Sequence, residues 1–291
     1  SGGVLSVNQD RALGAVPGST DSNNITINGG TLKTTASFTI NTKRGIQLDA
    51  SNSTINVDAS TTLTYAGIIV HQGSETNNGY TKSGGGTFAL SGDSTYSGVT
   101  TISAGVITIA HAGSLGSISG ATSITSGAAL SISGGITVAE PITVNGTGVS
   151  SGGAIVFTAN DNTYSGAITL GSTSTIVSTG GAQTISVTVN GGQALTITAN
   201  GNLIVSGAVG GSTDLSSYTV TTTGSASQTF SANVETTGNQ TYTAAGGIVT
   251  SGARTFDSSS GTVNFASALS GNNNVTVTGN ADIDGAIPDI A

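Results

Sequence analysis

Short segments in which apolar and polar residues alternate recur along the whole chain. Clear examples are residues 25–27, 38–40, 107–109 and 275–277, each with a Thr between two apolar residues. Alternation with a period of two places successive side chains on opposite faces of a β-strand. Gly-Gly, Asn-Gly and Ser-Gly pairs separate the segments and supply the positive φ angles that tight turns need. The pattern predicts an all-β chain of many short strands.

The spacing of these segments indicates a solenoid. Three successive segments make a coil of about 22 residues, which is the size range of a solenoid repeat. Thr-X-Thr triplets recur at about the same interval, and in a parallel β-helix they would stack on one face, one triplet per coil. This candidate threonine face consists of Thr173, Thr175, Thr196, Thr198, Thr219, Thr221, Thr241 and Thr243. The alternative is a chance recurrence in a Thr-rich chain.

A longer internal repeat is also present. Residues 93–102 resemble residues 161–170, and a shorter third copy lies at residues 239–242. We expect each repeated Tyr to lay its ring against the next coil with its hydroxyl at the surface, and each Gly to relieve a crowded corner. The positions of this structural repeat are Gly86, Gly92, Thr95, Tyr96, Gly98, Thr163, Tyr164, Gly166 and Tyr242.

The segment from Lys82 to Ile109 contains a Lys, a Gly-rich turn, Phe-Ala-Leu, Ser-Gly, Thr-Tyr, Gly and two apolar-x-apolar strands in that order. This order resembles the autotransporter-associated β-strand repeat family, although Asp93 and Ser94 depart from its usual small residue and Asn. The resemblance is best over about residues 5–110 and looser over residues 154–291. It implies a right-handed parallel β-helix that is secreted to the bacterial cell surface. We therefore predict one continuous β-solenoid over residues 1–291, with roughly 13 coils.

Charge and composition exclude several partners. The chain has 6 Lys and Arg against 14 Asp and Glu, for a net charge of −8, and it has no Cys. Nucleic-acid binding needs clustered basic residues that neutralise phosphates, so we expect no nucleic-acid partner. No apolar run reaches the roughly 20 residues that a membrane-spanning helix needs, so we expect no membrane insertion of this segment.

Residues that could carry chemistry are few. Asp282 and Asp284 form a weak calcium candidate, but the twelve-residue loop that ends in Glu is missing. His71 and His111 are isolated, and a histidine zinc site needs more ligands than these two residues supply. We therefore expect no catalytic residues, no metal and no cofactor. A polysaccharide-degrading β-helix enzyme remains an alternative that this pattern disfavours, because its paired carboxylates are not evident.

The leading hypothesis is a non-enzymatic extracellular module of an adhesin passenger. It would act as a projecting rod in adhesion, cell–cell contact or biofilm matrix, with an unknown glycan or protein ligand. One alternative is a filament subunit: residues 4–7 and 275–277 resemble interior coils, so the chain is either cut from a longer passenger or stacks end to end. Another is an ice-binding solenoid that uses the threonine face.

Overall fold

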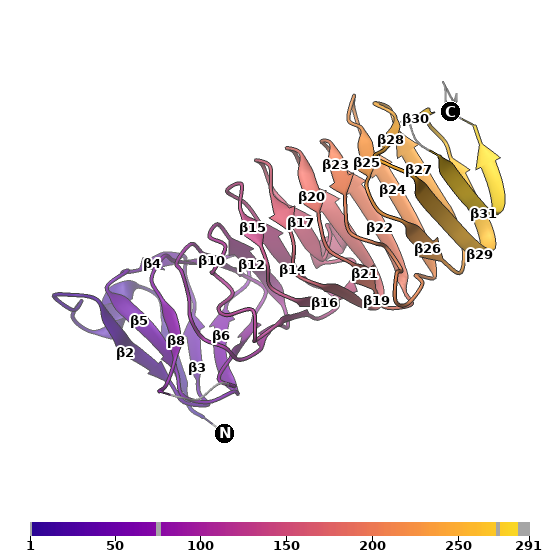
Figure 1. Ribbon diagram of the computed structural model, residues 1–291. Coiled ribbons are helices and arrows are strands. Elements are labelled where there is room, and N and C mark those ends of the chain that lie inside the picture. The colour runs from indigo at the N-terminus through magenta and orange to yellow at the C-terminus, as the bar shows by residue number, and fades with distance from the viewer. Residues whose placement is uncertain (1, 74–76, 272–273, 285–291) are drawn as a thin grey trace. The chain divides into compact units, whose positions relative to one another are not determined.

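The computed structural model describes residues 2–73, 77–271 and 274–284. It is an all-β parallel solenoid of about 12 turns with about 22 residues per turn, and it contains almost no helix. The strands follow one another as repeated short arrows along the chain (Figure 1). The fold class and coil length predicted from the sequence are therefore confirmed. The number of turns is slightly below the expected 13.

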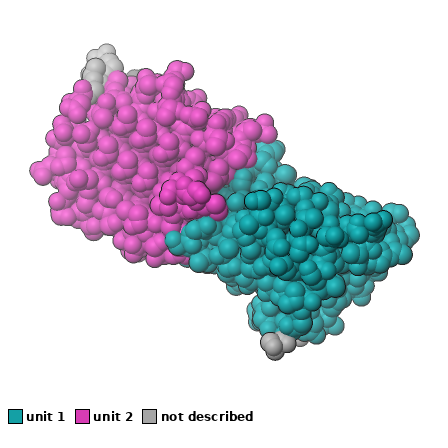
Figure 2. Space-filling view, turned by 180° about the vertical axis from the view of Figure 1, so that it is seen from behind, with its two compact units in different colours: residues 1–143 teal, residues 144–291 magenta. Residues whose placement is uncertain are grey.

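The chain divides into two compact units, residues 1–143 and 144–291 (Figure 2). That all 291 residues form one continuous domain stays a prediction. The elements of unit 1 are β1 (Val4–Val7), η1 (Asp10–Leu13), β2 (Asp21–Ile27), β3 (Thr31–Thr34), β4 (Phe38–Ile40), β5 (Arg44–Leu48), β6 (Ser53–Val57), β7 (Thr62–Tyr65), β8 (Ile69–His71), β9 (Tyr80–Ser83), β10 (Thr87–Leu90), β11 (Thr100–Ile102), β12 (Gly105–Ile109), β13 (Thr122–Ile124), β14 (Ala128–Ile132) and β15 (Thr137–Val138).

Strand β16 (Ile142–Gly146) begins at the boundary between the units. The remaining elements belong to unit 2: η2 (Val149–Ser151), β17 (Ile155–Phe157), β18 (Thr163–Tyr164), β19 (Ile168–Ser178), β20 (Gln183–Ile185), β21 (Val189–Asn190), β22 (Ala194–Ala199), β23 (Leu203–Val205), β24 (Ser217–Thr222), β25 (Gln228–Phe230), β26 (Val234–Thr236), β27 (Gln240–Ala244), β28 (Ile248–Thr250), β29 (Arg254–Phe265), β30 (Leu269–Ser270) and β31 (Val275–Ile283).

In unit 1, parallel pairing stacks like positions of successive turns into columns. One inward column runs Phe38, Leu63, Phe88, Ile107 and Leu130. All of these except the half-buried Phe38 are fully buried or nearly so. Because side chains alternate between faces, the intervening Thr and Ser residues point outward. This column is therefore one apolar stack in the core of unit 1.

Unit 2 repeats the arrangement with larger side chains toward its end. An inward column runs Ile155, Ile176, Ile197, Val220, Tyr242 and Phe265. The rings of Tyr242 and Phe265 stack with centroids 5.1 Å apart, and Phe256 meets Phe265 edge to face at 5.1 Å. Such contacts add to the stabilisation that burial alone provides.

Candidate functional site

The repeat segment carries an unexpected residue in the core of unit 1. Lys82 occupies an inward position of β9, where its neighbours in the column are Ile55 and Ile102. Its side chain is fully buried. Every other described member of this column from Leu32 to Ile124 is apolar, so Lys82 replaces an aliphatic residue.

Three backbone carbonyls surround the amine of Lys82. Its Nζ donates to the oxygens of Gly84 at 2.7 Å, Gly86 at 2.6 Å and Ala104 at 2.8 Å. Burial lowers the pKa of Lys82 to about 8 from its ordinary 10.5. An ammonium group has three N–H donors and no acceptor, so the three carbonyls match its protonated form, which predominates at pH 7. The Gly-rich turn of the repeat thus folds around a buried cation.

The tyrosines of the repeat are buried more deeply than the sequence suggested. Tyr96, Tyr164 and Tyr242 are all 0% exposed. The hydroxyl of Tyr242 donates to Oε1 of Gln240 at 2.7 Å, and that of Tyr96 lies 2.6 Å from Oγ1 of Thr100. The expectation that these hydroxyls reach the surface was wrong. For Tyr96 and Tyr242, polar side chains inside the coil supply the hydrogen-bond partners.

The glycines of the repeat lie where two turns approach closely. A Cβ added to Gly92 would lie 1.9 Å from the backbone oxygen of Gly67. A Cβ on Gly86 would lie 2.2 Å from the backbone oxygen of Asp58, and a Cβ on Gly98 would lie 2.2 Å from the backbone nitrogen of Gly79. Gly166 is buried as well. The two threonines lie closer to the surface: Thr95 is exposed, and Thr163 pairs with Thr184 of the next turn.

The predicted threonine face forms two outward columns in unit 2. Thr175, Thr196, Thr219 and Thr241 pair in succession across β19, β22, β24 and β27. Beside them, Thr198, Thr221 and Thr243 pair in the same way. These side chains are half-buried or exposed, and the four strands lie side by side in Figure 1.

The register differs from the sequence expectation at the first triplet. Thr175, and not Thr173, pairs with Thr196, and Val177 takes the place next to Thr198. Thr173 lies two residues before Thr175 on the same strand and therefore belongs to neither column. The reason is that this turn is shorter than the interval between the triplets, and pairing between strands, rather than sequence interval, sets the register.

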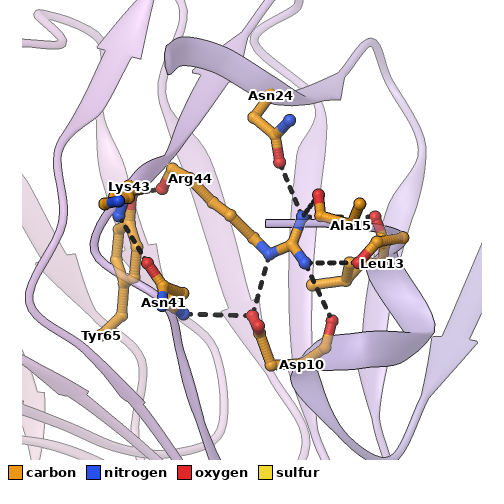
Figure 3. A network of polar contacts seen from close by, with 9 residues as sticks. Asp10, Leu13, Ala15, Asn24, Asn41, Lys43, Arg44 and Tyr65 are labelled. Carbon is orange, nitrogen blue, oxygen red and sulfur yellow. Dashed lines mark hydrogen bonds and ion pairs between the residues drawn. The ribbon is translucent and has the colours of Figure 1, made fainter. Parts of the chain in front are cut away.

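A second buried cation, Arg44, holds the first loop of unit 1 (Figure 3). Its side chain is fully buried, and its Nε lies 3.0 Å from Oδ1 of Asp10. The guanidinium also donates to Oδ1 of Asn24 at 2.9 Å and to the oxygens of Gly14 at 2.7 Å and Ala15 at 3.2 Å. Nothing in the local sequence marks Arg44, since its partners come from residues 20 to 34 positions earlier. The network anchors η1 and leaves no open donor for a ligand.

A buried carboxyl group lies among hydroxyls in unit 1. Glu140 is 3% exposed, and burial raises its pKa to about 7 from 4.5, while a hydrogen bond from Thr122 acts in the opposite direction. The rings of Tyr80 and Tyr96 lie nearby and meet edge to face at 5.6 Å. Sequence reasoning did not single out this residue, whose one signal is a Glu between two short strands, directly before Pro141.

The candidate calcium residues lie near the end of the described chain. Asp282 is an exposed residue of β31, and its Oδ2 accepts from Nδ2 of Asn264 at 3.3 Å. Asp284 follows the strand and is also exposed. His111 lies 3.8 Å from Asp93 at the surface, while His71 of β8 pairs with Leu48 of β5. Among the described residues, no group of three or more His, Asp or Glu side chains is placed to hold a metal ion.

The part of the chain that the structure describes likewise contains no helix long and apolar enough to cross a membrane.

Comparisons with known proteins match this chain to a repeat family and to a bacterial adhesin. The family model described as passenger-associated-transport-repeat matches residues 81–109. The chain is also 33% identical over 183 residues to the adhesin BmaC autotransporter of Brucella suis biovar 1 (strain 1330). That alignment covers 58% of this chain but 5% of the relative, so the chain spans a small part of that protein's length. No solved structure matches the chain. The resemblance inferred from the sequence is confirmed: residues 81–109 of the chain match the passenger-associated-transport-repeat.

Proposed function

We propose that this chain is a non-enzymatic, adhesin-like module that contacts other surfaces outside the cell. The observation that carries the proposal is the similarity over 183 residues to an autotransporter adhesin. The passenger repeat at residues 81–109 supports an extracellular location. Adhesion, cell–cell contact and biofilm matrix are the roles that we propose for it, and a surface glycan or protein is the proposed ligand.

The architecture suits such a role. Structural side chains are held inside the solenoid, as Lys82 and Arg44 illustrate, so the outward residues are free to vary without loss of the core. The net charge of −8 is spread over a chain with few charged residues, which favours contacts through hydroxyl and amide groups over contacts steered by charge.

The test is attachment of chain-coated fluorescent particles to cultured epithelial cells, to bacteria and to matrix-coated surfaces. We expect attachment above that of albumin-coated particles on at least one of these surfaces. The matched control is the chain with Ile109→Asp, which places a charge in an apolar column and which we expect to unfold. Attachment equal to that of albumin on every surface would contradict the proposal.

A specific observation favours a second candidate function for the threonine face, which is the ordering of water at an ice surface. Thr side chains on strands have restricted χ1 angles, strands lie about 4.8 Å apart, and alternate residues lie about 6.6 Å apart along a strand. The columns from Thr175 to Thr241 and from Thr198 to Thr243 thus hold hydroxyl and methyl groups in a regular array.

Thermal hysteresis and inhibition of ice recrystallisation test this second candidate. We expect activity in the unmodified chain, loss of activity in Thr219→Lys, and no loss in Thr229→Lys. Thr229 is a half-buried, outward residue of β25 outside the two columns. A hysteresis no greater than that of albumin would eliminate the candidate.

A further inference from the structure

Unit 2 contains a polar groove at one corner of three successive turns. The groove has a volume of about 530 Å³ and lies across the connections from β19 to β20, β22 to β23 and β24 to β25. These strands are labelled in Figure 1. Its lining residues are Gly181, Ala182, Asn200, Gly201, Asn202, Thr223, Gly224, Ser225 and Ala226.

The lengths of the three connections explain the groove. The middle connection is residues 200–202, while its neighbours are residues 179–182 and 223–227. The shortest connection therefore lies between two longer ones. Gly201 lets this middle connection lie directly against the turn before it, because a Cβ there would be 1.9 Å from the Gly181 oxygen. Gly181 and Gly224 have φ angles of 76° and 64°, which disfavour larger side chains at both walls.

The two asparagines of the groove have their oxygens held by the chain and their amide hydrogens free. Oδ1 of Asn202 accepts from the nitrogen of Ser227 at 2.9 Å and from its Oγ at 3.3 Å. Oδ1 of Asn200 accepts from the hydroxyl of Thr223. Neither Nδ2 group hydrogen-bonds to a described residue. A backbone N–H can only donate, so the bond from Ser227 fixes the orientation of the Asn202 amide and leaves its N–H groups as donors.

The lining residues determine which class of ligand fits. The groove has no Lys, Arg, Asp or Glu in its lining, and it has no aromatic or large aliphatic side chain. An anion would find no cation there, and a peptide side chain would find no apolar pocket. A neutral molecule rich in hydroxyl oxygens matches oriented amide donors and the Ser225 hydroxyl.

We propose that this groove binds a neutral saccharide. The inference deepens the proposed adhesin function, on which it rests, by naming the ligand class and the residues that contact it. Asn200 and Asn202 donate hydrogen bonds to sugar oxygens, and Ser225 contributes a hydroxyl at the rim.

The experiment follows the side-chain amide signals of Asn200 and Asn202 by NMR in the full chain. The probes are neutral oligosaccharides of glucose, galactose, mannose and N-acetylglucosamine, with a sialylated oligosaccharide as the anionic comparison. We expect at least one neutral probe to shift both signals at millimolar concentration, and the sialylated probe to bind more weakly. The absence of any shift with every neutral probe would overturn the proposal.

Matched variants separate the groove from the rest of the surface. Asn200→Asp with Asn202→Asp keeps the oxygens that Thr223 and Ser227 contact but removes the amide donors, and we expect it to weaken binding about tenfold or more. Asn233→Asp is the control, because exposed Asn233 likewise accepts a backbone bond, from Thr255 at 3.0 Å, outside the groove. Ser225→Phe leaves both asparagines in place but puts a large side chain into the groove, and it should also abolish binding. Equal affinity in the double variant and the control would overturn the proposal.

The same variants distinguish this inference from the proposed function. If coated particles adhere and the groove variants adhere equally well, the groove proposal fails while the adhesin proposal stands. If the sugar shifts the groove signals but particles adhere nowhere, the groove proposal stands and the adhesin proposal fails.

Discussion

Arg44, Lys82 and Glu140 are ionisable residues that lie inside unit 1, where an unpartnered charge would be costly. Each has polar partners from another turn: Asp10 and carbonyls for Arg44, carbonyls for Lys82, and Thr122 for Glu140. A thin solenoid core has little apolar volume, so the backbone itself serves as the partner of a buried cation. Replacing Lys82 should therefore lower the free energy of unfolding, whereas replacing Glu140 should raise it relative to the unmodified chain as the pH rises.

Replacing Lys82 should destabilise the fold more than replacing a surface lysine. We expect Lys82→Ala to lower the free energy of unfolding by about 3 kcal/mol or more, because three carbonyls lose their donor and a cavity is left. Lys82→Met keeps the volume and should cost less. The control is Lys33→Ala, which removes a surface ion pair with Asp58 at 3.2 Å and should change stability by about 0.5 kcal/mol or less. Urea unfolding measures all three, and equal losses for Lys82→Ala and Lys33→Ala would contradict the role of the buried amine.

Glu140 should make unit 1 less stable as the pH rises from about 4.5 to about 7. Its folded pKa is about 7 and its ordinary value is 4.5, so within this window the folded state holds a proton that the unfolded state has released. The contribution of Glu140 to the free energy of unfolding is therefore highest below this window and falls as the pH rises through it.

The measurement is the difference in melting temperature between the unmodified chain and Glu140→Gln across this pH range. We expect Glu140→Gln to gain stability relative to the unmodified chain as the pH rises, because a neutral amide does not ionise. Two profiles that run parallel from pH 4 to pH 8 would show that the carboxyl group ionises normally.

The strands of the solenoid stabilise their neighbours through their inward side chains. In β12, Ile107 and Ile109 are fully buried, and Thr108 between them points outward. Ile109 pairs with Leu90 of the preceding turn and Ile132 of the next. Because each turn contacts mainly its two neighbours, damage to one strand should spread along the stack.

A charge at an inward position of β12 should unfold the turns beside it. We expect Ile109→Asp to cost more than about 4 kcal/mol, since it places an unpartnered carboxylate in an apolar column. Thr108→Asp, one residue away on the outward face, should change stability by less than about 1 kcal/mol. Circular dichroism and hydrogen exchange report both effects. A folded Ile109→Asp variant with normal protection in β10 and β14 would refute the column arrangement.

For the whole molecule, we predict that stability does not depend on a metal ion. The two carboxylates at Asp282 and Asp284 are exposed, and one of them already contacts Asn264. Chelation with EDTA should leave the melting temperature of the chain unchanged. A fall of several degrees that calcium restores would instead assign a calcium site to this region.

We also propose that the isolated chain of 291 residues associates end to end at high concentration. Strand β1 pairs with β3, and β31 pairs with β29, so each has one edge that pairs with no described strand. The carbonyls of Gly3 and Val7 accept bonds from the segment of β3, and the carbonyl of Asn274 accepts one from β29. Because successive residues of a strand direct their backbone groups to opposite sides, the N–H groups of Ser6 and Val275 point to the open edges.

Proline at these two positions is the test. Ser6→Pro and Val275→Pro remove a donor from the open edge without breaking the existing ladder, so we expect them to prevent association that the unmodified chain shows by light scattering and electron microscopy. Thr276→Pro is the control for damage to the ladder, since its N–H faces β29. A chain that stays monomeric at millimolar concentration would refute the proposal.

The sequence by itself determined the strands, the coil length and the family resemblance. These depend on local alternation, on turn glycines and on a motif of consecutive residues, as in residues 82–109, so no long-range information was needed. Parallel pairing then follows, because short strands with a constant interval bury their apolar faces most readily by stacking.

Only the tertiary structure decided the register and the interior partners. Thr175 rather than Thr173 joins the threonine face because corners differ in length from turn to turn, and pairing absorbs the difference. Lys82 is an internal cation because Ala104, in the next turn, completes its shell of carbonyls. The polar groove exists because a short corner falls between two longer ones. Each of these features arises where residues about one turn apart in sequence meet, and no local pattern records that contact.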